Sequence, residues 1–146
     1  MTAPVSFKNL KAYTSPRRFS GFQIPISLQS MAIRRYCEER GFRFNLHANE
    51  NITHNSHLVL ERLISDSTSY EGIAMCSAGM LPTDRVHRVE LVQRAFEFGL
   101  SLHFVFEQMV VSNPSQIAAL DELVVLNSLG DRVPDLLSGM RSIGSV

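Results

Sequence analysis

The chain has 146 residues, of which 45% are hydrophobic and 19% are charged, a composition typical of one soluble globular domain rather than a disordered chain. Its 14 basic and 14 acidic residues cancel, so the net charge argues against nucleic acid or a membrane surface as a partner. No apolar run approaches the roughly 18–20 residues of a transmembrane helix, and the N-terminus lacks the apolar core of a signal peptide, which predicts a cytoplasmic protein.

In the first half of the chain, the spacing of apolar residues switches between the period of a strand and that of a helix. In order, we expect a strand over 10–14, a helix over 28–40, a strand over 42–46 and a helix over about 56–66. Pro16 and Gly21 mark the first connection as a loop, and Gly41 stands where a glycine ends a helix. The first strand therefore leads into a polar loop and then into a helix.

The second half of the chain continues this alternation. We expect a strand over 70–76, a helix from a cap at Thr83 or Asp84 to Gly99, a strand over 101–106 and a long helix over 115–129. The two strand segments are almost wholly apolar, as in central parallel strands that are buried on both faces. The residues predicted to occupy the centre of the sheet are Ile73, Ala74, Met75, Phe104 and Val105.

Strands that alternate with helices require right-handed parallel crossovers, so the predicted fold class is α/β. We expect a three-layer sandwich, with a four- or five-stranded, mainly parallel sheet and helices on both faces. Residues 1–130 are predicted to form the single domain, and residues 131–146 an extension that packs on it or at an oligomer interface. The last helix has apolar residues on more than one face, including Val124, Val125 and Leu126, which predicts a homodimer or larger homo-oligomer.

Ligands of open parallel sheets bind beyond the carboxyl ends of the strands, where loops diverge and helix N-termini face the crevice. Polar side chains follow all four predicted strands. The ligand-binding candidates are Ser15, Arg17, Arg18, Ser20, Asn49, Asn51 and Ser77. The candidates for nucleophilic or acid–base catalysis are Cys76, Glu50 and Glu107. Two adjacent arginines beside a helix N-terminus suit a carboxylate or phosphate ligand, because a guanidinium bonds two oxygens at once.

Each candidate also has a structural interpretation. The two arginines could belong to a solvated basic loop, and Cys76 could be a small buried side chain, since a nucleophilic thiol requires a lowered pKa. Glu50 and Glu107 could instead cap neighbouring helices. His103, in the middle of a strand, is expected to be a hydrogen-bonded core histidine rather than a catalytic base.

No motif points to a metal or a cofactor. His54 and His57 have a spacing compatible with metal binding, but no third ligand stands near them in the sequence. Glycine-rich nucleotide loops, the GxSxG elbow and the HExxH zinc motif are absent, and Cys37 and Cys76 are too few and too far apart for a zinc site built from cysteine pairs. We therefore expect neither a metal nor a bound cofactor.

The stretch from Tyr13 to Cys37 resembles the start of the serine-recombinase (resolvase) catalytic domain, in which a Tyr-x-Arg-Val-Ser strand precedes a glutamine-bearing helix. The likeness is carried by Ser27-Leu-Gln29 and Ala32-Ile-Arg-Arg-Tyr-Cys37. It implies a resolvase-like or flavodoxin-like fold. It does not imply recombinase chemistry, because Ser15 stands in place of the strand arginine and residues 76–82 lack the Asp-Arg-Leu-x-Arg motif. The chain is therefore not expected to be a DNA recombinase.

A second resemblance covers nearly the whole chain. It rests on Gly21-Phe-Gln-Ile-Pro-Ile-Ser-Leu-Gln29, Tyr36-Cys-Glu38, Asn49-Glu-Asn-Ile52, Tyr70-Glu-Gly-Ile73, Met75-Cys-Ser77, Met80-Leu-Pro82 and Ser101-Leu-His-Phe-Val105 with Glu107. In these motifs the chain is similar to the "sporadic carbohydrate cluster" family of small bacterial proteins, named for gene clusters that make surface polysaccharides and unusual sugars. The resemblance implies a cytoplasmic role in carbohydrate biosynthesis. The residues beyond about 130 depart from the family's pattern.

Two functions fit these observations. In the first, the protein is an enzyme, or the partner of one, that acts on a phosphorylated or nucleotide-linked sugar held by Arg17 and Arg18. In the second, it is a non-catalytic ligand-binding or partner-binding module of a biosynthetic assembly, in which the same loops only bind the ligand or partner. Both functions imply a small anionic or sugar ligand as the partner, without nucleic acid or membrane. The sequence leaves open whether the chain is an enzyme.

Overall fold

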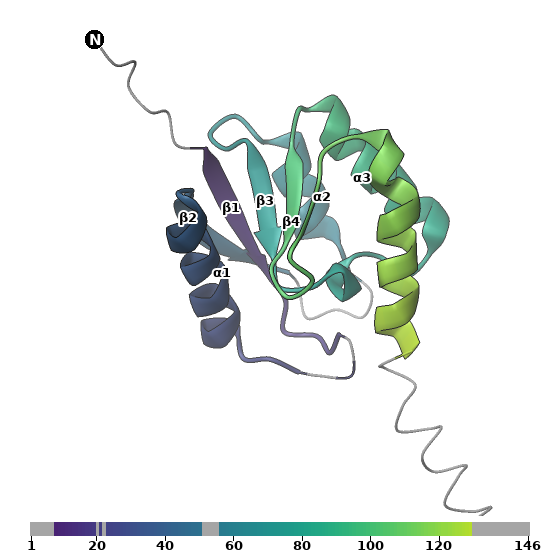
Figure 1. The fold of residues 1–146 in the computed structure, drawn as a ribbon, viewed down its shortest axis with the longest axis horizontal. Helices are drawn as coiled ribbons and strands as arrows, with labels where there is room; N and C mark the ends of the chain where they lie inside the picture. The colour runs from purple at the N-terminus through teal and green to yellow at the C-terminus, as the bar shows by residue number, and fades with distance from the viewer. Residues whose placement is uncertain (1–7, 20, 22, 51–55, 130–146) are drawn as a thin grey trace, which may run out of the picture.

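The computed structural model describes residues 8–19, 21, 23–50 and 56–129, which form an α/β sandwich of three layers (Figure 1). Within these residues the sheet has five strands in the order β2-β1-β3-β4-β5. They are β1 (Asn9–Thr14), β2 (Arg43–Asn49), β3 (Gly72–Met75), β4 (Ser101–Phe104) and β5 (Met109–Val111). The first four strands are parallel, and β5 is antiparallel to β4. The predicted fold class, a mainly parallel sheet between helices, is confirmed.

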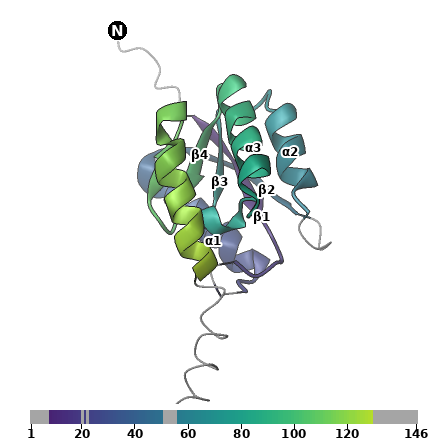
Figure 2. The same cartoon turned by 90° about the vertical axis from the view of Figure 1, so that its right-hand side faces the viewer.

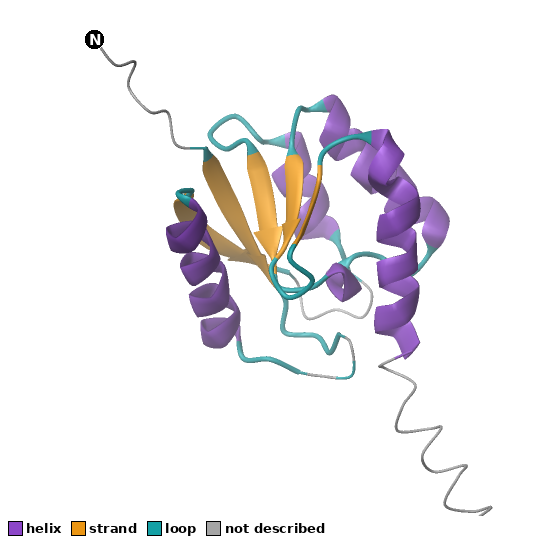
Figure 3. Ribbon diagram, in the orientation of Figure 1, coloured by secondary structure: helices purple, strands orange, loops and turns teal. Residues whose placement is uncertain are grey.

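Helices cover both faces of the sheet. They are α1 (Ile26–Arg40), α2 (Leu58–Ser65), α3 (Arg85–Glu97) and a last helix at residues 117–129, with the short 3₁₀ turns η1 (Ala78–Met80) and η2 (Pro114–Gln116). In Figures 1 and 2, α1 lies on one face, whereas α2, α3 and the last helix lie on the other. Figure 3 shows the orange sheet between these two purple layers. No helix in the described part of the chain is both long enough and apolar enough to cross a membrane.

The helix ends follow the signals in the sequence. Gly41 and Gly99 have φ values of 75° and 73°, in the left-handed region that glycine adopts without strain. Gly41 ends α1, and its backbone N–H donates to the Cys37 carbonyl. The Asp84 carboxylate accepts a hydrogen bond of 3.0 Å from the His87 backbone N–H and so caps α3. These local signals were correctly interpreted from the sequence alone.

The core is centred on β3 and β4. Ile73, Ala74, Met75 and Phe104 are fully buried, as predicted. Val105 follows the end of β4 and is only half-buried, so its predicted place in the centre of the sheet is wrong. Complete burial of a large apolar side chain contributes roughly 1.5–3 kcal/mol, and this burial fixes which face of each helix meets the sheet.

The sequence prediction missed the hairpin formed by β4 and β5. Strand β4 ends at Phe104 rather than at residue 106, and the chain turns through Gln108, whose φ of 52° is left-handed. This turn contains neither glycine nor proline, so nothing in the sequence interrupts the apolar run. The last helix begins with the turn η2 and becomes α-helical at residue 117 rather than 115. The predicted extension over 131–146 lies outside the described residues.

The order of the strands reverses between β1 and β3. After β1 the chain crosses to β2 on one side, and after β2 it returns to β3 on the other side of β1. In doubly wound sheets, the crevice at this switch point is where ligands bind. The loop that begins at Ser15 and the segment that begins at Cys76 leave the sheet there. The fold therefore brings the predicted site residues of these two segments to one edge.

Candidate functional site

A buried glutamine anchors the loop after β1 to α1. Gln29 is fully buried, its Oε1 accepts a hydrogen bond from the Ser15 backbone N–H (3.1 Å), and its Nε2 donates to the carbonyls of Ser15 (2.7 Å) and Ile24 (2.8 Å). Ser15 is 1% exposed, and its hydroxyl accepts a hydrogen bond from the Arg17 backbone N–H (3.3 Å). These contacts fix the direction in which the chain leaves β1 and so position Arg17.

Arg17 connects the loop after β1 with His57, the residue that precedes α2. Its side chain is half-buried, with Nε 3.3 Å from the Ser15 hydroxyl and Nη2 3.0 Å from His57 Nε2. His57, the residue before α2, is 6% exposed, and the same nitrogen lies 3.1 Å from the Met80 carbonyl at the end of η1. Within the described residues, the Arg17 guanidinium forms no ion pair with a carboxylate. A partly buried cation thus lies at the switch point.

The remaining ligand-binding candidates of the first two loops do not join Arg17. Arg18 is exposed and donates a hydrogen bond of 3.1 Å to a backbone carbonyl of its own loop. Asn49, at the end of β2, accepts a hydrogen bond from the Thr14 hydroxyl. Ser20 and Asn51 lie outside the described residues. Of the two predicted arginines, Arg17 is linked to the segment after β3, through His57.

Glu50 caps helix α2. It is 4% exposed, and its carboxylate accepts hydrogen bonds from the Tyr13 hydroxyl (2.8 Å) and from the backbone N–H groups of Val59 and Leu60 (both 3.2 Å). It thereby satisfies amides of the first helical turn and interacts favourably with the helix dipole. Burial, followed by the charge of Glu50, raises the pKa of the Tyr13 hydroxyl, and Arg17 lowers it. Of the two interpretations of Glu50, the geometry favours the cap.

Cys76 is fully buried directly after β3, with its thiol 3.8 Å from the Gln29 carbonyl. Burial raises the pKa of the Cys76 thiol to about 12, and the charge of Glu107 adds to this effect. The thiol is therefore neutral at physiological pH. Because the thiolate is the nucleophilic form of cysteine, this environment favours the structural interpretation of Cys76.

Glu107 joins the segment after β3 to the last helix. Its Oε1 accepts hydrogen bonds from the Ser77 hydroxyl (2.7 Å), the Ala78 backbone N–H (3.2 Å) and Asn127 Nδ2 (3.1 Å). Ser77 is 1% exposed and caps η1 by accepting from the Gly79 N–H (3.1 Å). The second oxygen, Oε2, is buried and has no hydrogen-bond partner in the described structure. Such an atom costs about 1–3 kcal/mol, which makes it a candidate acceptor for a ligand's donor group.

The turn η1 lies between these two groups of contacts. His57 contacts Met80 at its C-terminal end, whereas Glu107 contacts Ser77 and Ala78 at its N-terminal end. Three residues of 3₁₀ helix rise about 6 Å. Arg17, through His57, and Glu107 are therefore linked to opposite ends of one short turn at the carboxyl end of β3.

Three residues of the site were missed by sequence reasoning: Gln29, His57 and Asn127. The sequence does contain a signal for Gln29, since it is the glutamine of the helix in the recombinase resemblance. The spacing of His57 from His54 suggests a metal ligand and no other role, and Asn127 lies within a predicted helix. Their contacts with Ser15, Arg17 and Glu107 join residues 14, 40 and 20 positions apart, so no local pattern reports them.

His103 is a buried and hydrogen-bonded core histidine, as predicted. Its Nδ1 lies 2.7 Å from the Tyr36 hydroxyl, and its Nε2 lies 2.8 Å from the Ser101 hydroxyl. Burial lowers the pKa of His103 to about 4, and the charges of Arg40 and Lys8 act in the same direction. The imidazole is therefore neutral at physiological pH. In the part of the chain that the structure describes, no three His, Cys, Asp or Glu side chains form a group that could hold a metal ion.

Comparison with solved structures shows which known fold this chain shares. The chain has the fold of the catalytic domains of serine recombinases, or resolvases. The N-terminal catalytic domain of TP901-1 integrase is similar with a TM-score of 0.60 and 18% sequence identity, covering 82% of this chain and 95% of that domain. A resolvase family site-specific recombinase from Streptococcus pneumoniae is similar with a TM-score of 0.56 and 11% identity, covering 93% of this chain and 99% of that chain.

At these identities the likeness concerns the fold alone, and it confirms the resolvase-like architecture expected from the first resemblance. No protein-family model matches the chain, and no curated protein matches it. The similarity to the sporadic carbohydrate cluster family therefore stays a prediction.

Proposed function

We propose that the protein binds a phosphorylated or nucleotide-linked sugar at the carboxyl ends of β1 and β3, and acts in the synthesis of a bacterial surface polysaccharide or an unusual sugar. The observation that carries the proposal is Arg17, a half-buried guanidinium at the switch point that forms no ion pair with a carboxylate of the described residues. The sequence motifs similar to the sporadic carbohydrate cluster family support the sugar part of the ligand.

The chemistry of arginine suits the anionic part of such a ligand. A guanidinium presents its N–H groups in one plane and bonds two oxygens of a phosphate at once. In the ligand-free protein, Ser15 and His57 hold Nε and Nη2 of Arg17, so the guanidinium already lies at the crevice before an anion binds. In a partly dry crevice, a hydrogen bond to a charged group is typically worth about 1.5–3 kcal/mol.

Glu107 is the catalytic candidate that best fits an enzyme at this site. Glu50 is engaged in capping α2, and the Cys76 thiol is buried and neutral. Glu107 has an oxygen, Oε2, without a hydrogen-bond partner among the described residues, which suits proton transfer to or from a sugar hydroxyl. We assign it the acid–base role in the enzyme form of the proposal.

The alternative is a non-catalytic ligand-binding or partner-binding module of a biosynthetic assembly. It is favoured by the structural contacts of Glu50 and Cys76, because two of the three catalytic candidates are engaged in maintaining the fold. In this form of the proposal, Arg17 and Glu107 recognise the ligand and no bond is made or broken.

Both forms of the proposal include a small anionic or sugar ligand, a cytoplasmic location and no nucleic-acid or membrane partner. DNA cleavage is not proposed, because Ser15 replaces the strand arginine of recombinases and the segment 76–82 carries no arginine that would neutralise a phosphate. The zero net charge of the chain also argues against DNA binding.

The test is to measure binding of a panel of sugar phosphates and nucleotide sugars by titration calorimetry. Arg17→Ala should weaken the ligand at least tenfold, since about 1.4 kcal/mol corresponds to a factor of ten. Arg18→Ala, which removes the adjacent exposed guanidinium, is the matched comparison and should lose less. Wild-type affinity in Arg17→Ala, with an unchanged melting temperature, would show that the anion binds elsewhere.

A further inference from the structure

One nitrogen of His57 has two hydrogen-bonding partners that require opposite chemistry. Nε2 lies 3.0 Å from Arg17 Nη2, which is a donor, and 3.1 Å from the Met80 carbonyl oxygen, which is an acceptor. An imidazole nitrogen either carries a hydrogen and donates, or carries a lone pair and accepts. Nε2 can bond Arg17 only without a hydrogen and Met80 only with one. The two hydrogen bonds therefore exclude each other.

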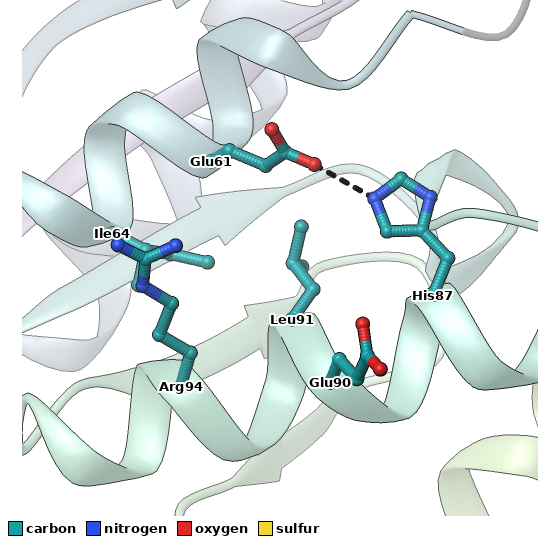
Figure 4. A pocket seen from close by; sticks show the side chains of 6 residues that line it. All are labelled: Glu61, Ile64, His87, Glu90, Leu91 and Arg94. Atoms are coloured by element: carbon teal, nitrogen blue, oxygen red, sulfur yellow. Dashed lines mark hydrogen bonds and ion pairs between the residues drawn. The ribbon is translucent and has the colours of Figure 1, made fainter.

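The His57 ring is buried and packed against a neighbouring ring. The residue is 6% exposed, and its carbonyl accepts the Glu61 backbone N–H (2.9 Å) at the start of α2. Its ring meets the His87 ring at 90°, with centroids 5.9 Å apart. His87 Nε2 is in turn 2.7 Å from Glu61 Oε1, a contact drawn in Figure 4 at one side of a pocket of about 100 Å³ between α2 and α3.

Resting on the proposed function, we propose that His57 is the positioning residue for Arg17 and changes tautomer when an oxyanion of the phosphate class binds. Without ligand, the neutral ring carries its hydrogen on Nδ1, and Nε2 accepts from Arg17 Nη2. When Arg17 turns to the anion, Nδ1 loses its hydrogen to solvent and Nε2 gains one from solvent. Nε2 then donates to the Met80 carbonyl, and the charge of the ring is unchanged.

The charged groups around the ring support a neutral imidazole in the ligand-free state. A doubly protonated ring would direct an N–H at the Arg17 guanidinium across 3.0 Å, which is repulsive. The other titratable groups are His87 on α3, Glu61 on α2 and Glu50, whose carboxylate caps the first turn of α2. His87 and Glu61 contact each other, and Glu50 accepts from the backbone of α2 and from the hydroxyls of Tyr13 and Ser56. Arg17 and Met80 thus compete for Nε2.

The experiment is to record long-range proton–nitrogen NMR spectra of the full chain labelled with nitrogen-15 in histidine, at pH 8, with inorganic pyrophosphate as the probe. The His57 signals are assigned by their loss in His57→Gln. In the ligand-free wild type, Nε2 should resonate in the range of an unprotonated imidazole nitrogen. Pyrophosphate should shift it into the protonated range, and Arg17→Ala should do so without ligand. Arg18→Ala, the matched control, should leave the ligand-free tautomer unchanged.

Two results would overturn the inference: Nε2 already protonated in the ligand-free wild type, or Nε2 unprotonated in folded Arg17→Ala. If Arg17→Ala does not fold, the wild-type titration decides, and bound pyrophosphate with an unchanged tautomer is a negative result. If pyrophosphate does not bind but Arg17→Ala moves the hydrogen, the proposed anion site fails while the positioning of Arg17 by His57 stands. The two proposals therefore fail separately.

Discussion

Glu107 keeps one buried carboxylate oxygen without a hydrogen-bond partner in the described structure, and a folded protein retains such an atom at a cost of about 1–3 kcal/mol. Glu107→Gln preserves the shape of the side chain and removes its charge. If Glu107 is the acid or base, the variant should lose turnover of the activated sugar while ligand affinity stays largely intact. In the non-catalytic form of the proposal, affinity alone should change.

The measurement for Glu107→Gln combines product formation by the purified protein with titration calorimetry of the same ligand. Glu122→Gln, on the exposed surface of the same last helix that carries Asn127, is the control and should behave as wild type. Full turnover by Glu107→Gln would show that this carboxylate takes no part in the reaction.

The start of α2 depends on one residue outside the helix. The Glu50 carboxylate accepts from two backbone N–H groups of the first turn and from the Tyr13 hydroxyl, and the bonds from Leu60 and Tyr13 are buried. Glu50→Ala should therefore lower the free energy of unfolding by about 1–3 kcal/mol, because buried donors lose their acceptor. Urea denaturation would measure this loss, with Glu97→Ala at the exposed end of α3 expected within about 0.5 kcal/mol of wild type. A Glu50→Ala protein of unchanged stability but without turnover would instead support a catalytic role for Glu50.

The stability of the whole molecule should depend on pH through His103. Its folded-state pKa is about 4, against an ordinary value of 6.5, so between these values the unfolded chain binds a proton that the folded chain does not. The free energy of unfolding should be highest above about pH 6.5 and fall as the pH drops towards 4, by roughly 3 kcal/mol from this group. Urea denaturation across this range would measure it. His103→Gln should make the free energy of unfolding less dependent on pH between about 4 and 6.5. An unchanged pH dependence in the variant would show that other groups cause it.

The last helix supports the prediction of a homodimer or larger homo-oligomer. Val125, Leu126 and Leu129 are 55%, 61% and 45% exposed along one side of it. Apolar side chains that gather on a surface gain free energy when a second copy covers them. Light scattering at micromolar concentration should give a mass above the 16.4 kDa of one chain, and Leu126→Glu should reduce it to that value. A wild-type particle of 16.4 kDa would contradict the prediction.

Most of the architecture could be predicted because the spacing of buried apolar residues along a short segment already distinguishes a strand from a helix. The apolar run that contains Ile73 and Met75 predicts a buried strand, and glycines such as Gly41 mark helix ends, whatever the rest of the chain does. The hairpin of β4 and β5 was not predictable in this way. Its turn passes through Gln108 in a left-handed conformation that glycine or asparagine usually supplies, and only the pairing of β5 with β4 selects it.

By itself, the sequence determined that polar residues such as Arg17 and Glu107 follow parallel strands, and parallel crossovers bring those strand ends to one edge of the sheet. Only the tertiary structure decided their partners. The Glu50 carboxylate reaches α2, the Arg17 guanidinium reaches His57, and Asn127 reaches Glu107 across 10 to 40 residues of chain. The physical reason is that a side chain's role depends on the donors, acceptors and solvent that packing places around it, and packing is not a local property of the chain.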